Sequence, residues 1–87
     1  MYYVYIIESL VDSSFYIGYS KKVQQRLLKH NNAKSGYTSR KQPWILRYVE
    51  QFDNKTDAIK REIFLKRQKN RNFYLKLIEN QKDENID

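Results

Sequence analysis

Five side chains in this sequence could together cleave a phosphodiester bond. They are Tyr5, Tyr16, Arg26, His30 and Glu62. A guanidinium can grip phosphate oxygens, and an imidazole or a phenol with a lowered pKa can accept a proton near neutral pH. A carboxylate can bind a divalent cation. No single member of the set would indicate a nuclease, but the combination in this order does.

The arginine, the histidine and the tyrosines of this set each also have a simpler structural interpretation. Arg26 and His30 are four residues apart, so they lie on the same side of a helix and could act on one ligand. Alone, Arg26 could be a solvated charge and His30 a helix-end histidine bonded to a nearby carbonyl. Tyr3, Tyr5 and Tyr16 are typical of strand surfaces, where aromatic rings pack well.

Glu62 is a charged residue on a predicted helical face that is otherwise apolar. It comes four residues after Ala58 and three before Leu65, and Ile59 and Ile63 form an adjoining stripe that we also expect to point inward. A carboxylate in such a place needs a partner. The partner is either a metal ion or a basic side chain, for example the lysine four residues on in the same helix.

The apolar pattern predicts an α+β domain with the element order ββαβαα. Residues 2–8 and 15–19 are rich in β-branched and aromatic side chains and are joined by turn formers, which predicts an opening hairpin with both faces at least partly covered. Residues 44–52 follow Pro43 and suit a third strand beside the hairpin. Gly18 marks either a close approach of a backbone or ligand, or a simple bulge.

Helical spacing and capping residues predict the first two helices. The first spans residues 21–31 with Ser20 as its N-cap. The second spans residues 56–69, with Asn54 as N-cap and Asp57 as a capping-box-like partner.

The remaining segments are a loop, a last helix and a tail. Residues 31–43 are polar and rich in turn formers, which indicates a functional loop without a regular element. After a break at residues 70–72, the apolar residues Phe73, Tyr74, Leu77 and Ile78 predict a last helix. We expect one domain over residues 1–80 and a short acidic, frayed tail over residues 81–87.

Composition limits the kind of protein. The chain has 87 residues, 40% of them hydrophobic and 15% aromatic, which suits one small globular domain. Cysteine is absent and there is one histidine, which excludes a disulfide framework and a zinc site built from thiolates or several imidazoles. We see no signal-peptide pattern and no apolar run of about 20 residues, so we expect a cytoplasmic protein without a membrane partner.

The positive charge is concentrated in the middle of the chain. The formal net charge is +7, and no acidic residue occurs between Asp12 and Glu50. This asymmetry favours nucleic acid as the partner, bound through its phosphate backbone with low sequence specificity. The residues that we expect to contact it are Lys21, Lys22, Lys29, Lys34, Arg40, Lys41, Lys66, Arg67 and Lys69.

The ordered motifs resemble those of the GIY-YIG nuclease domain, and especially its small stand-alone bacterial members. The matching residues are Tyr3-Val4-Tyr5, then after ten residues Tyr16-Ile17-Gly18, then Arg26 and His30, and finally Glu62. The resemblance covers residues 2–78. It implies a three-stranded antiparallel sheet flanked by helices, in agreement with the element order above.

The resemblance also implies an activity, namely an endonuclease that hydrolyses DNA phosphodiester bonds at one Mg²⁺ or Mn²⁺ ion held by Glu62. It implies a structure-selective enzyme of the repair or recombination type. Arg26 would offset charge on the phosphate. Tyr5, Tyr16 or His30 would take the proton from the attacking water; a tyrosine is favoured, and the sequence does not choose further. His30 matches a position that is His or Tyr in relatives.

Two positions depart from the family pattern, and they keep other functions open. Tyr3 replaces the glycine of the first motif, and Tyr19 stands where some relatives have a lysine that assists proton removal. The alternative function is a non-catalytic nucleic-acid-binding module on the same scaffold, and a third hypothesis is a protein-interaction domain with an aromatic docking surface. We expect a monomer or weak homodimer, with a partner protein supplying the choice of target.

Overall fold

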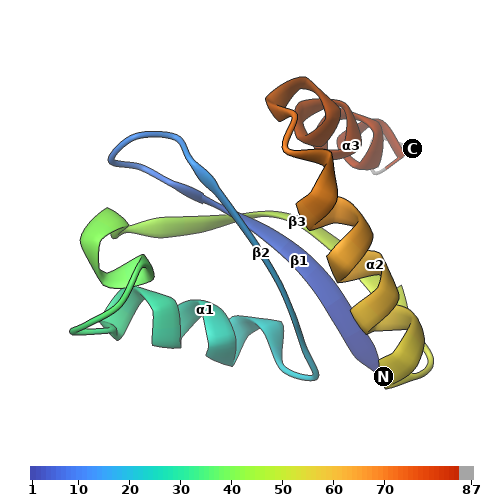
Figure 1. Ribbon diagram of the computed structural model, residues 1–87, viewed down its shortest axis with the longest axis horizontal. Helices are drawn as coiled ribbons and strands as arrows, with labels where there is room; N and C mark the ends of the chain where they lie inside the picture. The colour runs from blue at the N-terminus through green and yellow to red at the C-terminus, as the bar shows by residue number, and fades with distance from the viewer. Residues whose placement is uncertain (85–87) are drawn as a thin grey trace.

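The computed structural model describes residues 1–84, with side chains described as far as Gln81. The element order and the antiparallel three-stranded sheet are as predicted (Figure 1). The elements are β1 (Tyr2–Ser9), β2 (Phe15–Ser20), α1 (Val23–Asn32), the short 3-10 helix η1 (Thr38–Lys41), β3 (Trp44–Phe52), α2 (Lys55–Gln68) and α3 (Arg71–Glu84). No helix in this part of the chain is long and apolar enough to span a membrane.

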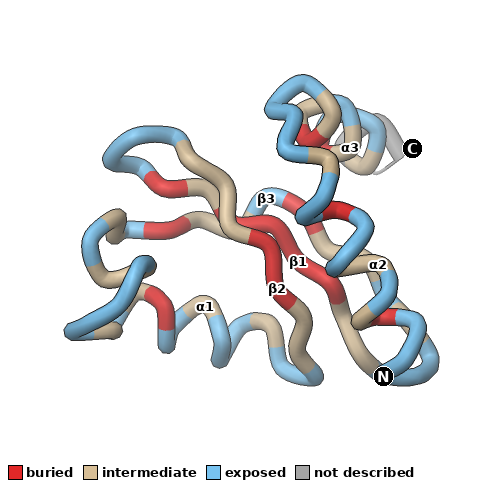
Figure 2. Tube along the Cα trace, viewed as in Figure 1, coloured by how far each residue is buried: buried red, intermediate tan, exposed pale blue. Residues whose placement is uncertain are grey.

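The central strand is β1, and both of its faces are covered. The strand order is β2-β1-β3, and both pairs are antiparallel. Because side chains alternate along a strand, Tyr5 and Ile7 point to one face and Val4 and Ile6 to the other. All four are buried, and Figure 2 shows this stretch of β1 in the middle of the molecule. The prediction that both faces of the hairpin are covered is therefore confirmed.

The helices form two layers on opposite faces of the sheet (Figure 1). On one face, Val23 and Leu27 of α1 pack against Tyr5, Ile7 and Trp44. On the other face, α2 and α3 share a core with the strands that consists of Val4, Ile6, Ile17, Tyr48, Ala58, Leu65, Tyr74 and Ile78. The edge strand β2 contacts both α1 and α2, so side chains from both layers can meet along it.

The N-cap of α2 is Asn54, as predicted, although the helix begins at Lys55, one residue earlier than predicted; the N-cap predicted for α1 is wrong. The Asn54 side chain accepts a hydrogen bond from the Asp57 N–H at 2.9 Å and donates one to the Asp57 carboxylate at 3.1 Å. Helix α1 begins at Val23 instead of residue 21, and Ser20 is not its N-cap. The Ser20 hydroxyl instead accepts a hydrogen bond from the Lys22 N–H at 3.0 Å, and this bond closes a local turn ahead of the helix.

The prediction that Ile59 and Ile63 form a second inward-facing row on α2 is only partly correct. Ala58 and Leu65 are fully buried and Ile59 is half-buried, but Ile63 is 42% exposed. The three-stranded sheet is narrow, so α2 contacts it along one line of side chains. Ile63 is about 100° round the helix from Glu62 and faces water.

The segment after α1 contains η1, which the turn formers in the sequence did not indicate, and it is fastened at both ends. Asn31 bonds twice to Trp44: its side chain accepts from the Trp44 N–H at 2.6 Å and donates to the Trp44 carbonyl at 3.0 Å. Gln42 donates to the His30 carbonyl at 2.8 Å. These bonds fix the loop to the end of α1 and the start of β3.

A tyrosine of α3 caps the end of α2. Lys69 follows α2 in the left-handed conformation, with φ of 46°. The Tyr74 hydroxyl donates to the Leu65 carbonyl at 2.6 Å and accepts from the Lys69 N–H at 3.2 Å. One phenol therefore satisfies backbone groups that the end of a helix leaves without partners.

The last helix extends further than the sequence indicated. Residues 81–84, expected to begin a frayed tail, belong to α3, and residues 85–87 lie outside the described residues. The Gln81 side-chain amide bonds to the backbone of Val49 in β3, accepting from its N–H at 3.3 Å and donating to its carbonyl. This contact ties the C-terminal end of α3 to the sheet.

The substitution Tyr74→Phe should lower the free energy of unfolding by about 1 kcal/mol, because it removes the capping hydroxyl and keeps the ring. Equilibrium urea denaturation measures this loss. Tyr19→Phe is the control, since it removes the same atom from a half-buried ring; it should cost less than about 0.5 kcal/mol. Equal losses in the two variants would contradict a capping role for the Tyr74 hydroxyl.

Candidate active site

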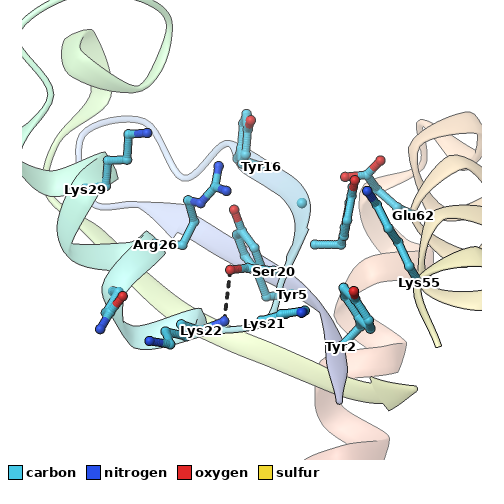
Figure 3. Close-up of a pocket in the computed structure, with 13 residues that line it drawn as sticks. Tyr2, Tyr5, Tyr16, Ser20, Lys21, Lys22, Arg26, Lys29, Lys55 and Glu62 are labelled. Atoms are coloured by element: carbon cyan, nitrogen blue, oxygen red, sulfur yellow. Dashed lines mark hydrogen bonds between the residues drawn. The ribbon is translucent and has the colours of Figure 1, made fainter. Parts of the chain in front are cut away.

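A cleft of about 830 Å³ opens along β2, between α1 and α2 (Figure 3). Four of the five residues predicted to be catalytic line it, namely Tyr5, Tyr16, Arg26 and Glu62. They come from β1, β2, α1 and α2, so the fold brings them together from distant parts of the sequence. Three lysines of the predicted nucleic-acid surface also line the cleft: Lys21, Lys22 and Lys29.

Gly18 makes room for the ring of Tyr5. The two residues are cross-strand partners in a β1–β2 pairing that has no register shift. A Cβ atom at position 18 would lie 2.5 Å from the Tyr5 hydroxyl oxygen and 2.7 Å from its Cζ, which is too close for any real contact. Of the two explanations for this glycine, the structure therefore supports the close approach and not the bulge.

The Tyr5 hydroxyl is hydrogen-bonded to His30 Nε2 at 3.0 Å, and both residues are buried. Burial raises the pKa of the Tyr5 phenol; the neighbouring Tyr16 and Glu62 raise it further, while Arg26 opposes them. Burial also lowers the pKa of His30, helped by nearby cations. Both groups are therefore neutral near pH 7, and which of the two donates this hydrogen bond depends on which ring nitrogen of His30 carries the proton. In this state neither of the bonded atoms is available to take a proton from water.

The structure places Arg26 and His30 in different environments, although both are on α1. Arg26 is exposed and lines the cleft, whereas His30 is not among the lining residues. The His30 ring lies against Tyr5 and Tyr16, with ring centroids 6.2 and 4.8 Å apart. The last turn of α1 packs on these two tyrosines, so His30 does not share a ligand-facing surface with Arg26. Its side chain bonds to a phenol and not to the carbonyl considered above.

Tyr16 is the more accessible of the two phenols, since it is half-buried and lines the cleft. Its ring packs edge-on against His30 and Trp44, at centroid distances of 4.8 and 6.2 Å. It is stacked with Tyr37 at 6.3 Å. These aromatic contacts fix the ring beside the cleft.

The α1 side of the cleft is a basic wall. Lys22, Arg26 and Lys29 follow one another at helical spacing and all line the cleft. Figure 3 shows the Arg26 guanidinium between this helix and the Tyr5 phenol. This wall suits an anionic ligand that lies along β2.

Glu62 lies on the opposite wall, on α2, with its side chain 14% exposed. Its Oε1 is 3.7 Å from the Nζ of Lys66, so the salt bridge considered from the sequence is present, in a long and partly exposed form that contributes little. Among the described residues, no group of three or more acidic or histidine side chains could hold a metal. A single carboxylate suits Mg²⁺ or Mn²⁺, which keep several water ligands and bind phosphate oxygens, but not a zinc ion.

Sequence reasoning missed several cleft residues, among them Tyr2, Tyr19, Gln25 and Lys55. Lys55 could have been found, because it precedes Glu62 by seven residues, which is about two helical turns. Tyr2 carries the ammonium of Lys21 over its ring, at 5.1 Å from the centroid. Nothing in the sequence placed Gln25 near the other site residues.

The remaining residues predicted to bind nucleic acid lie outside the cleft lining. They are Lys34, Arg40, Lys41, Lys66, Arg67 and Lys69. Lys41 pairs with Asp12 at 2.6 Å and lies over the ring of Tyr37, 5.0 Å from its centroid. Nucleic-acid contacts by these residues stay a prediction.

The family described as the GIY-YIG catalytic domain matches residues 1–75 of the chain. The chain belongs to the GIY-YIG family. The resemblance seen in the motifs is therefore confirmed, and the family is one of nucleases. No solved structure was found to match this GIY-YIG domain.

Several small proteins of the UPF0213 group are similar to this GIY-YIG domain. One from Staphylococcus saprophyticus is 43% identical over 66 residues, which are 75% of this chain and 79% of the relative. One from Halobacterium salinarum is 40% identical over 67 residues, 76% of this chain and 86% of the relative. One from Staphylococcus epidermidis is 42% identical over 66 residues, 75% and 79% of the two chains.

In this GIY-YIG domain, Gly18→Ala should displace the Tyr5 ring and lower the free energy of unfolding by about 1 to 3 kcal/mol, as overpacking does. Urea denaturation measures the loss. The same substitution in a Tyr5→Phe background should cost less, because the closest clashing atom, the hydroxyl oxygen, is gone. An equal cost in both backgrounds would mean that the Tyr5 hydroxyl is not what excludes a side chain at position 18.

Acidification should destabilise the GIY-YIG domain through His30. The unfolded histidine takes up a proton near pH 6.5, whereas the folded one, with its lowered pKa, does so only at a lower pH. Neutral, buried His30 therefore makes its full contribution to the free energy of unfolding above about pH 6.5, and this contribution is lost as the pH falls below that value. Denaturation curves across this range should show the loss in wild type and not in His30→Gln, which cannot titrate. An equally steep loss in His30→Gln would assign it to another group.

Proposed function

We propose that this chain is a divalent-metal-dependent endonuclease that hydrolyses DNA phosphodiester bonds. The observation that supports this most is the meeting of Arg26 and Glu62, from opposite helix layers, in one cleft with Tyr5 and Tyr16. The salt bridges of the described side chains do not join Arg26 to Glu62. A cation and an anion held apart across a cleft leave both available to a phosphodiester and its metal ion.

In the proposed reaction, water attacks the phosphorus atom as the bond to the leaving nucleotide oxygen breaks. Arg26 would donate hydrogen bonds to the non-bridging oxygens, where negative charge builds up. Tyr16, after losing its own proton to solvent, would accept the proton of the attacking water, and the leaving oxygen would take a proton from solvent. Of the three proton acceptors that the sequence left open, Tyr5 and His30 are buried and bonded to each other, which favours Tyr16.

Glu62 would hold the divalent cation, and Tyr5 would keep the surrounding elements in position. A bound Mg²⁺ or Mn²⁺ supplies Lewis-acid stabilisation of the phosphoryl charge. The donor chemistry fits, because Glu62 lines the cleft and its pair with Lys66 is long. Tyr5, fixed by His30 and by its close approach to Gly18, would keep β1, β2 and α1 in register around the reacting atoms.

The proposed substrate is DNA that is recognised by charge and shape. The lysines in the cleft suit phosphates, which carry no base information, so we infer low sequence specificity. We further propose a structure-selective role in repair or recombination in the cytoplasm, on branched, nicked or single-stranded DNA, with target choice aided by a partner protein.

The substitution Glu62→Gln should reduce cleavage at least about 100-fold, since it removes the proposed metal ligand and keeps the shape of the side chain. Labelled single-stranded, duplex, flap and four-way DNA, each with Mg²⁺, Mn²⁺ or EDTA, make up the assay. Glu79→Gln removes an exposed carboxylate of α3 and is the matched control, with activity expected to equal that of wild type.

Two outcomes of this assay would count against the proposal. Cleavage that continues in EDTA or is unchanged in Glu62→Gln would contradict a metal site at this residue. Binding to DNA without cleavage under any condition would favour a non-catalytic nucleic-acid-binding module on the same scaffold.

A further inference from the structure

Lys55, the first residue of α2, lines the cleft but has no part in the proposed hydrolysis. It precedes Glu62 by seven residues, so the two side chains project from the same face of α2, about two turns apart. Figure 3 shows both on the α2 side of the cleft, across from Arg26. Lys55 therefore places a positive charge on the α2 side of the cleft, opposite the basic residues on the α1 side.

The two walls of the cleft differ in charge. The α1 wall presents Lys22, Arg26 and Lys29, whereas the α2 wall presents the carboxylate of Glu62. A strand of nucleic acid that crosses β2 has phosphates on both sides of the bond to be cut. The phosphate on the α2 side would meet the negative charge of Glu62, and Lys55 is the one cation that α2 contributes to the lining among the described residues.

The ammonium group of Lys55 is available for a ligand. The residue is exposed. The salt bridges among the side chains described here involve other basic residues, namely Lys41, Arg47, Arg61, Lys66 and Arg71. Lys66, one turn beyond Glu62, is also exposed, but it is paired with Glu62 and lies outside the cleft lining.

We propose that Lys55 is a phosphate-binding residue that holds the substrate strand on the Glu62 side of the cleft. This assignment rests on the proposed function and specifies its ligand as a strand with at least two linked phosphates, and not a free nucleotide. The strand lies across β2 at Gly18, with one phosphate at Arg26 and a neighbouring one at Lys55. A lysine acts as a point charge, so this contact adds affinity without reading the base sequence.

Binding measurements in EDTA test Lys55 without requiring cleavage. The affinity for a fluorescein-labelled single-stranded oligonucleotide is measured by anisotropy over a range of salt concentrations. Each phosphate contact contributes about 0.7 to the slope of log K against log salt for a single strand, so Lys55→Ala should reduce the slope by about that amount. Lys60→Ala, which removes the same charge from an exposed position of α2 outside the cleft lining, should leave the slope unchanged. Lys55→Arg should keep the wild-type slope.

The outcomes separate this inference from the nuclease proposal. An unchanged slope in Lys55→Ala, an equal reduction in Lys60→Ala, or no binding by wild type at low salt would overturn the role of Lys55. A reduced slope in Lys55→Ala supports that role even if wild type does not cut DNA under any condition and the nuclease proposal fails. Circular dichroism of each variant checks that the fold is retained.

Discussion

The candidate site depends on where the Tyr5 phenol lies. Its hydroxyl is held by His30 from α1, and its ring occupies the space that a side chain at Gly18 of β2 would take. One ring therefore fixes the positions of two strands and a helix relative to one another. Tyr16 packs against His30 and Trp44 beside this arrangement, so its ring is placed before any ligand binds. Such preorganisation is what a site needs to stabilise charge that develops during a reaction.

The narrow sheet explains how opposite charges come to share one cleft without pairing. Helices α1 and α2 pack on opposite faces, yet both contact the edge strand β2. Arg26 approaches this edge from one layer and Glu62 from the other, with Tyr5 and Tyr16 between them. A wider sheet would keep the two layers apart. Three strands thus give a small domain a two-sided site that a single helix pair would not provide.

The features that depend on nearby residues could be predicted from the sequence. The element order and the Asn54 cap follow from local periodicity and capping chemistry. The ordered motifs indicated four residues that line the cleft. The features that depend on tertiary packing could not be predicted. His30 is covered by rings from two strands, and Ile63 is exposed because the sheet does not extend beneath it. Lys55 was missed although its helical spacing from Glu62 was visible, because exposed lysines are common and its spacing matters only beside a cleft.

The contact between Gln81 and Val49 occupies hydrogen-bonding groups at one edge of the sheet. β3 is an edge strand, and unpaired N–H and C=O groups on such an edge can pair with a strand from another molecule. The Gln81 amide occupies those groups of Val49, in place of a fourth strand. The family match ends at residue 75, so a domain cut there would keep every cleft residue and lose this protection. The end of α3 therefore covers one point of the β3 edge and makes strand addition there less favourable.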